Sequence, residues 1–292
     1  MHIDFVKMNG AGNDFVLIGD YFDQLHLSNE QVQWICDRHF GVGADGVIVV
    51  KPSINPDVVA FMDYYNSDGT KAEMCGNGIR CFSKFLVDGG VVESGSDSFA
   101  VDTLSGKKEI SILRDIEGNM QLATVDMGAP ILEPSKVPTA LSGVPTEWGS
   151  VALEQEIVVD GRTYKATCVS MGNPHAVIFV DDPLTFPVTE IGPKIETLGV
   201  FPEKTNVEFA HVDGDVITMR VWERGCGETL ACGTGCCATA VAAHMTGRAG
   251  RKVTLKVLGG EIGIEWSEEG GDLGSVIMTG PAKKAFAGSL EI

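Results

Sequence analysis

The sequence predicts an α+β protein made of two similar domains, and three observations lead to this fold class. Its 292 residues are long for one hydrophobic core and suit two domains of ordinary size. Short apolar runs between turn residues outnumber helical patterns, so antiparallel sheet should dominate. A pattern of Gly-Asn, strands, Cys-Gly-x-Gly and a helix occurs twice along the chain, which predicts two pseudo-symmetric halves.

The predicted strands are short segments bounded by glycine, proline, asparagine or aspartate. They are residues 4–8, 46–51, 58–65, 99–102, 156–160, 163–171, 205–212, 216–223, 252–257 and 261–266. Asp160-Gly161 and Asp213-Gly214 each separate two such runs, and Asp-Gly is typical of a type I′ hairpin turn.

Four helices are predicted, at residues 28–38, 77–87, 188–198 and 234–246. The first begins with Ser-Asn-Glu-Gln, a capping-box pattern. The second places Ile79, Phe82, Phe85 and Leu86 on one face. Residues 234–246 are rich in alanine and other small residues, which suits close packing, whereas Gly192-Pro193 interrupts the pattern of residues 188–198.

The internal repeat sets the predicted domain boundaries. Cys75-Gly76-Asn77-Gly78 precedes one helix and Cys232-Gly233-Thr234-Gly235 precedes another, and a Gly-Asn pair ending at Asn13 or Asn173 lies roughly 60 residues upstream of each cysteine. We expect one domain from residues 1–127 plus 275–292 and a second from residues 128–274, with the active site in the cleft between them.

Composition narrows the classes of function. Hydrophobic residues make up 44% and charged residues 21%, as in soluble globular proteins. The net charge of −18 would repel nucleic acid. No apolar run of 18 residues predicts a membrane helix, and the first residues lack the pattern of a signal peptide. We therefore expect a cytoplasmic protein that binds neither nucleic acid nor membrane.

The cysteines should be thiols, because structural disulfides are rare in the cytosol. The eight are Cys36, Cys75, Cys81, Cys168, Cys226, Cys232, Cys236 and Cys237. No C-x2-C pair occurs in the cluster near the C-terminus, and only Cys232 and Cys236 approach the spacing of zinc ligands. We expect no metal site, and a thiol-rich metal-binding or redox-sensing protein is the alternative outside enzymology.

Cys75 and Cys232 are the candidate catalytic residues because each directly precedes a helix in a glycine-rich turn. The helix dipole is expected to stabilise a thiolate and lower its pKa. The following N–H groups can hold a carboxylate. A thiolate on one face of an α-carbon and a thiol on the other could invert its configuration. Cys36, Cys81, Cys168, Cys236 and Cys237 are expected to be core residues.

Phosphate-binding nucleotide motifs are absent from the sequence, which has neither a P-loop nor a Gly-x-Gly-x-x-Gly turn in a βαβ unit. Use of pyridoxal phosphate stays open at this point, because its lysine has no short universal motif.

Seven ordered segments resemble diaminopimelate epimerase over nearly the full chain. They are residues 7–15 (KMNGAGNDF), 41–46 (GVGADG), 66–69 (NSDG), 74–81 (MCGNGIRC), 171–175 (MGNPH), 205–207 (TNV) and 223–229 (ERGCGET) running on to 232–235 (CGTG). The resemblance implies two domains that each wrap a sheet around a central helix. It also implies interconversion of LL- and meso-diaminopimelate, without cofactor or metal, for lysine and peptidoglycan synthesis. A homodimer is implied by resemblance only.

The resemblance assigns roles by position. Cys75 and Cys232 match the catalytic acid/base pair, supported by His175 and Glu223. Gly76-Asn77 and Gly233-Thr234 match the cradle for the reacting carboxylate. The residues that match substrate-holding groups are Asn13, Asn66, Asn173, Asn206, Glu223 and Arg224. Arg224 can pair a carboxylate with two hydrogen bonds.

Two departures and two alternatives accompany this prediction. Gly46 stands where many members carry a glutamine that contacts substrate, and Thr234 stands where serine is frequent. A racemase of another polar amino acid, such as histidine, would share the chemistry. A phenazine-biosynthesis-like isomerase would share the fold but lacks the paired cysteines. The two thiols could also oxidise to an inactivating disulfide when the site is empty.

Overall fold

The chain folds into two compact units in a computed structural model that describes residues 1–268 and 273–292. Unit 1 comprises residues 1–126 and 279–292, and unit 2 comprises residues 127–278. The return to unit 1 comes four residues later than residue 275. Val276 still exchanges hydrogen bonds with unit 2, donating to the Gly128 carbonyl and accepting from Met127 N–H, both at 2.9 Å.

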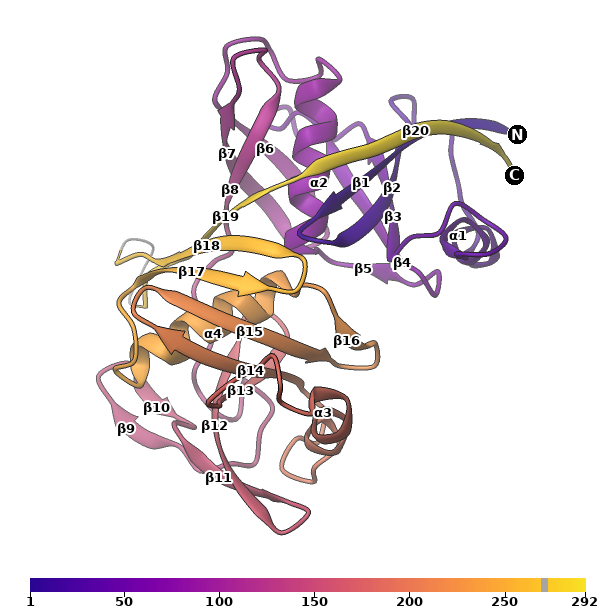
Figure 1. Cartoon of the computed structure of the whole chain (residues 1–292). Helices are drawn as coiled ribbons and strands as arrows, with labels where there is room; N and C mark the ends of the chain where they lie inside the picture. The colour runs from indigo at the N-terminus through magenta and orange to yellow at the C-terminus, as the bar shows by residue number, and fades with distance from the viewer. Residues whose placement is uncertain (269–272) are drawn as a thin grey trace. The chain divides into compact units, whose positions relative to one another are not determined.

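Unit 1 is a mixed sheet with two helices (Figure 1). Its elements are β1 (His2–Gly10), β2 (Asn13–Gly19), α1 (Asn29–Cys36), β3 (Gly46–Lys51), β4 (Phe61–Asn66), β5 (Lys71–Ala72), α2 (Gly76–Asp88), β6 (Ser98–Thr103), β7 (Gly106–Arg114), β8 (Met120–Asp126) and β20 (Lys283–Glu291). β19 (Val276–Pro281) spans the division and pairs with β8.

From β12 to β18, unit 2 repeats the order of elements that unit 1 has from β1 to β7, and three further strands precede this repeat (Figure 1). The elements of unit 2 are β9 (Val144–Thr146), β10 (Gly149–Val151), β11 (Gln155–Val159), β12 (Arg162–Ser170), β13 (Pro174–Phe179), α3 (Val188–Glu196), β14 (Asn206–Asp213), β15 (Val216–Glu223), β16 (Gly227–Thr229), α4 (Gly233–Met245), β17 (Lys252–Val257) and β18 (Gly260–Trp266).

The two units share one pairing pattern, which confirms the predicted pseudo-symmetry. In unit 1 the β1–β2 hairpin leads to β3, which is parallel to β2 and antiparallel to β4. In unit 2 the β12–β13 hairpin leads to β14, parallel to β13 and antiparallel to β15. The parallel pairs follow from the helical crossovers α1 and α3. Antiparallel pairing dominates elsewhere, as predicted.

Each unit wraps its sheet around one helix, as the resemblance implies. α2 contacts β1, β2, β3 and β8, and α4 contacts strands from β12 to β18. Every residue of α4 except Thr234 and His244 is buried, as expected for a helix that is apolar and small on all sides. Ile79, Phe82 and Leu86 are fully buried on α2, while Phe85 is half-buried.

The two Asp-Gly turns differ from each other. Asp160 and Gly161 connect β11 to β12 with φ of 51° and 76°, as a type I′ turn requires. Asp213, however, pairs with Val216, so the second turn consists of Gly214 and Asp215. Only Gly214 has a positive φ there, 61°, which is the type II′ arrangement. The prediction of a type I′ turn at Asp213-Gly214 is therefore wrong by one residue.

Helix α3 is continuous across Gly192-Pro193, although the sequence predicts an interruption there. A Cβ at Gly192 would lie 2.6 Å from Trp222 Cβ, so the glycine lets this helix pack directly on β15. Close packing on Trp222 outweighs the poor helix propensity of the two residues.

Ser28 provides a test of the local folding signals. Its hydroxyl accepts a hydrogen bond from Gln31 N–H, and the Gln31 amide oxygen accepts one from Ser28 N–H at 2.8 Å, so the predicted capping box forms. We predict that Ser28→Ala lowers the free energy of unfolding by about 1 kcal/mol. Urea unfolding measures this, with Ser142→Ala at an exposed loop position as the control. Equal stabilities for the two variants would contradict the prediction.

Candidate active site

Cys75 forms the N-cap of α2 in unit 1, in the extended conformation with φ −132° and ψ 123°. Its sulfur accepts a hydrogen bond from Gly78 N–H at 3.4 Å, and it lies 3.7 Å from Asn13 Oδ1. The side chain is half-buried. The first N–H groups of a helix have no partner within the helix itself, and such groups can bind an anion.

Asn13 is held beside Cys75 in one orientation. Its Nδ2 donates to Asp45 Oδ2 at 2.7 Å, and its Oδ1 accepts from Asn77 Nδ2 at 3.2 Å. The Asn77 oxygen in turn accepts from the guanidinium of Arg80 at 2.9 Å. Unit 1 therefore brings together Asn13, Cys75 and Asn77, with their carbonyl and thiol groups adjacent.

Charged residues stabilise the arrangement of Asn13, Cys75 and Asn77. Arg80, which sequence reasoning missed, is fully buried and also donates to the Gly76 carbonyl at 3.3 Å. Although burial opposes it, hydrogen bonds from Arg38 and Lys7 hold the pKa of Asp14 at about 2. The Asp14 carboxylate in turn bonds to the backbone N–H of Asp45, the partner of Asn13.

Asn66 and Gly46 face each other in the β3–β4 register. The Asn66 amide donates to Thr70 Oγ1 at 3.1 Å. A Cβ at Gly46 would lie 2.6 Å from the Tyr65 carbonyl and 2.7 Å from the Tyr64 ring. A side chain cannot enter here unless both the Tyr65 backbone and the Tyr64 ring move, so these two residues occupy the space beside Gly46.

Cys232 forms the N-cap of α4 in unit 2, the position of Cys75 in unit 1. Its sulfur lies 3.4 Å from Thr234 Oγ1, and only 6% of the residue is exposed. Burial, together with the charges of Glu223 and Glu208, raises the pKa of this thiol well above its ordinary value. The expected lowering by the helix dipole is therefore wrong for Cys232, because desolvation and two carboxylates outweigh the dipole.

Glu223 lies at the end of β15, next to this thiol. Its carboxylate accepts a hydrogen bond from Thr229 Oγ1 and interacts with the Cys232 thiol. Burial raises the pKa of Glu223 above its ordinary range. The strand end and the helix start thus place an acidic group and a thiol in contact.

His175 is fully buried between two polar partners. Its Nδ1 lies 2.6 Å from Glu208 Oε1, and its Nε2 lies 3.1 Å from Asn173 Oδ1. Sequence reasoning missed Glu208, which is also fully buried on β14. The available signal was one glutamate within the apolar run of residues 207–210.

Asn206 and Arg224 are linked through the backbone. Asn206 Nδ2 donates to the Pro174 carbonyl at 2.7 Å, and its Oδ1 accepts from Arg224 N–H at 2.9 Å. The exposed Arg224 side chain donates to the Glu203 carbonyl at 3.1 Å. Asn206 therefore fixes the loop that carries Arg224. Gly233 and Thr234 begin α4, as Gly76 and Asn77 begin α2.

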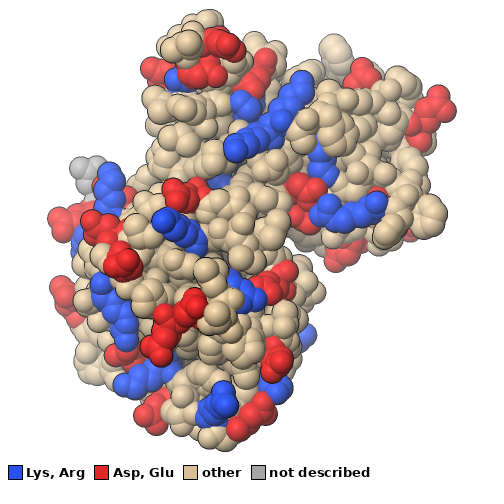
Figure 2. All heavy atoms as spheres, in the orientation of Figure 1, with Lys and Arg blue, Asp and Glu red and all other residues tan. Residues whose placement is uncertain are grey.

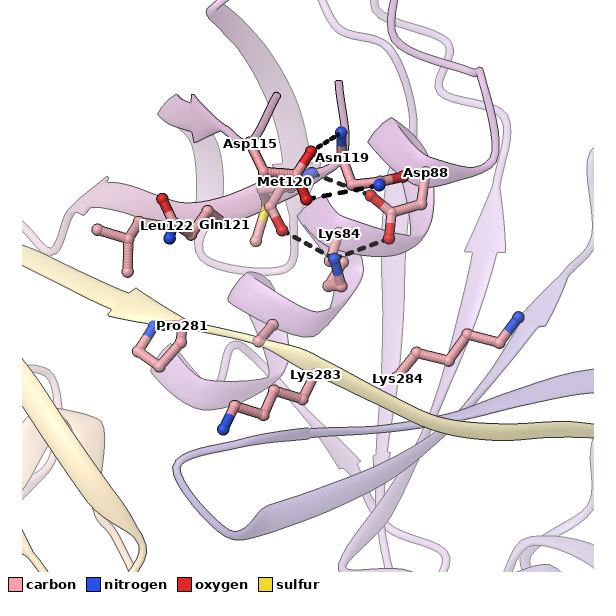
Figure 3. Close-up of a pocket in the computed structure, with 11 residues that line it drawn as sticks. Lys84, Asp88, Asp115, Asn119, Met120, Gln121, Leu122, Pro281, Lys283 and Lys284 are labelled. Atoms are coloured by element: carbon pink, nitrogen blue, oxygen red, sulfur yellow. Dashed lines mark hydrogen bonds and ion pairs between the residues drawn. The ribbon is translucent and has the colours of Figure 1, made fainter. Parts of the chain in front are cut away.

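A pocket in unit 1 lies away from these residues, where α2, β8 and β20 meet (Figure 3). Its polar groups largely satisfy one another. Lys84 donates to the Met120 carbonyl at 2.8 Å and pairs with Asp88 at 2.8 Å. The cysteine-centred groups therefore remain the better candidates for chemistry.

Neither a metal site nor a membrane-spanning helix is present among the described residues. Among the described residues, no group of three or more histidine, cysteine or acidic side chains is placed to hold a metal ion. No helix in the described ranges is long and apolar enough to cross a membrane. Figure 2 shows acidic and basic side chains intermixed on one face of the molecule.

Comparison with known proteins identifies the family of the chain. The family model described as diaminopimelate epimerase matches residues 5–133 and 167–285. The chain is 47% identical to a diaminopimelate epimerase from Leptospira biflexa, over 100% of both chains. It is 45% identical to another from Synechococcus elongatus, over 100% of this chain and 99% of that relative.

Solved structures share the fold at low sequence identity. A hydroxyproline epimerase from Agrobacterium vitis superposes with a TM-score of 0.71 at 13% identity, covering 99% of this chain and 92% of that one. A PhzF-family phenazine biosynthesis protein from Bacillus anthracis gives 0.69 at 17% identity, covering both chains fully. With a family match over most of the chain and relatives at 45–47% identity over its full length, the chain belongs to the diaminopimelate epimerase family.

Proposed function

We propose that this isomerase interconverts LL- and meso-diaminopimelate by transferring protons between Cys75, the substrate α-carbon and Cys232. The observation that carries the proposal is the equivalence of the two thiols. Each one caps the helix at the centre of its own unit, and each precedes glycine-rich N–H groups. Such a pair suits a reaction that must act on both faces of one carbon.

The proposed reaction needs one thiolate and one thiol. The thiolate removes the α-proton, and the electron pair left behind is delocalised into the α-carboxylate. The thiol then donates its proton to the opposite face, so the two sulfurs exchange protonation states. Helix N–H groups of α2 and α4 would stabilise the charge that develops on the carboxylate.

Cys232 is suited to start as the proton donor, because burial and Glu223 favour its thiol form. The half-buried Cys75 would then start as the base. These roles reverse when the reaction runs the other way. The eight thiols also suit a reducing compartment, and we propose a cytoplasmic location.

The first prediction concerns the thiols. We expect Cys75→Ala and Cys232→Ala each to lower turnover by about 100-fold or more, the typical contribution of a general acid or base. Incorporation of deuterium from heavy water at Cα measures this. Cys226→Ala, at an exposed cysteine of unit 2, is the control. Full turnover by either active-site variant would end the two-base proposal.

Substrate choice is tested in the same assay with diaminopimelate, lysine, histidine, glutamate and proline. Exchange that is fastest with diaminopimelate supports the proposal. Exchange that is fastest with histidine would identify a racemase of another polar amino acid instead.

A second prediction concerns the distal carboxylate. The loop fixed by Asn206 presents Arg224, whose guanidinium can bind a carboxylate through two hydrogen bonds. Arg224→Gln should raise KM for diaminopimelate roughly 10- to 100-fold, as expected when a hydrogen bond to a charged group is lost. Steady-state kinetics measures this, with the exposed Arg162→Gln on β12 as the control. An unchanged KM would remove Arg224 from the binding site.

A homodimer is proposed on the strength of β20. This strand pairs with β1, and every residue of it except Leu290 is exposed. Phe286 is 49% exposed at its centre, although it packs edge-on against Phe5. An exposed strand edge with an aromatic side chain favours pairing with a second copy.

Phe286→Asp is therefore expected to shift the protein from dimer to monomer, because a charge on the paired surface opposes association. Sedimentation velocity measures the change. The control is Phe22→Asp, at a phenylalanine of unit 1 that is 83% exposed. A wild-type protein that is already monomeric, or a Phe286→Asp variant that stays dimeric, would contradict this assembly.

A further inference from the structure

Unit 2 contains a polar pair in its core that the proposed proton transfer does not use directly. His175 on β13 and Glu208 on β14 are both fully buried, with Nδ1 and Oε1 2.6 Å apart. Glu208 Oε2 has no hydrogen-bond partner among the described residues. A buried carboxylate is costly unless it is neutralised or fully hydrogen-bonded, so a proton shared with His175 is needed to offset its charge.

The equivalent positions in unit 1 are apolar. Phe15 is opposite Gly46 in the parallel β2–β3 pair, as His175 is opposite Asn206 in β13–β14. Ile48, two residues beyond Gly46, therefore corresponds to Glu208. Phe15 and Ile48 are both fully buried.

The helix glycines give an independent check of this correspondence. Gly78 and Gly235 each lie three residues after their cysteine. A Cβ on Gly78 would lie 3.2 Å from Ile48 Cδ1, and one on Gly235 would lie 2.7 Å from Glu208 Oε1. Glu208 therefore occupies the position next to the start of α4 that Ile48 occupies next to the start of α2. Because unit 1 folds with an apolar pair there, the fold itself does not require the polar pair.

The protonation of this pair decides which end of Asn173 is available. A pair with net charge zero carries one proton between Nδ1 and Oε1 and a second proton on either Nε2 or Oε2. Of these two atoms only Nε2 has a hydrogen-bond partner among the described residues, Asn173 Oδ1 at 3.1 Å, so the second proton is placed on Nε2 and donated to that oxygen. The amide NH2 of Asn173 is then the end left for a ligand.

Asn13 in unit 1 is held the opposite way. Asp45 accepts from its Nδ2, so its Oδ1 is the end beside Cys75. The two equivalent asparagines therefore present an amide carbonyl in unit 1 and an amide NH2 in unit 2. The carbonyl can accept a hydrogen bond from the ammonium of an amino acid, and the NH2 can donate one to its carboxylate.

We propose that Glu208 is a positioning residue that, through a proton shared with His175, holds the NH2 of Asn173 toward the substrate. The inference rests on the proposed role of Asn173 in substrate binding. The other titratable groups near Glu208 are Cys168, Glu223 and Cys232. Burial raises the pKa of all three and none of them can be a cation, so none supplies a positive charge that could offset a Glu208 carboxylate in place of His175.

Histidine ¹⁵N resonances test the protonation directly, without relying on activity. The spectrum of the whole protein is assigned at His175 by comparison with His175→Phe. We expect Nε2 of His175 to carry a proton in the folded protein. An unprotonated Nε2 would overturn the inference, even if the proposed reaction is correct.

A double-mutant cycle tests whether Glu208 acts through Asn173. Glu208→Leu and Asn173→Ala should each lower kcat/KM for diaminopimelate roughly 10-fold or more, since each removes a substrate hydrogen bond. The double variant should be no worse than Asn173→Ala alone. Asp213→Asn, at the exposed end of β14, is the control. Additive losses, or a normal kcat/KM for Glu208→Leu, would overturn the inference alone.

One further variant separates positioning from folding, and Asn173→Ala separates the inference from the proposed function. His175→Phe with Glu208→Ile reproduces the apolar pair of unit 1, and should keep the native circular dichroism spectrum while losing activity. Native activity in that variant would overturn the inference. A normal kcat/KM for Asn173→Ala would instead remove the substrate role of Asn173, and the inference with it, while leaving the two-thiol reaction in place.

Discussion

The buried start of one helix is the feature on which each unit depends. α2 and α4 are enclosed by sheet, and the first N–H groups of any helix lack partners within it. Cys75 satisfies one such group at Gly78. The fold must satisfy this helix end in any case. A cysteine N-cap therefore places a thiol beside an anion-binding surface without extra structure.

The two units share one arrangement of strands and helices, but they differ in their polar side chains. Phe15 and Ile48 are replaced by His175 and Glu208, and Asn66 by Glu223 at the equivalent strand end. A proton donor and a proton acceptor need different proton affinities at the start of a reaction. Identical units would give two thiols of equal proton affinity. The acidic cluster around Cys232 supplies the difference, because it favours the protonated form of that thiol.

Local signals were enough to predict much of the fold. β3, β15 and β17 have both ends where the sequence placed them, and the capping box at Ser28 forms. The pairing of β20 with β1 joins the two ends of the chain, and no local pattern encodes a contact of that range. The cysteine motifs predicted the helix starts but not the raised pKa of Cys232, which depends on burial and on Glu208 from a distant strand. Charge partners of this kind become visible only when strand register is known.

The same register explains where substrate selectivity is expected to reside. Gly46 and Asn206 are equivalent positions, each at the start of a parallel strand. At Gly46 the Tyr65 carbonyl and the Tyr64 ring exclude a side chain, so unit 1 offers no flexible polar group at that point. At Asn206 the amide is tied to the backbone of Pro174 and Arg224, and so fixes the loop that presents a guanidinium. In the proposed reaction, recognition of a charged distal group is therefore expected from unit 2, whereas unit 1 would contribute the more accessible thiol and the oriented carbonyl of Asn13.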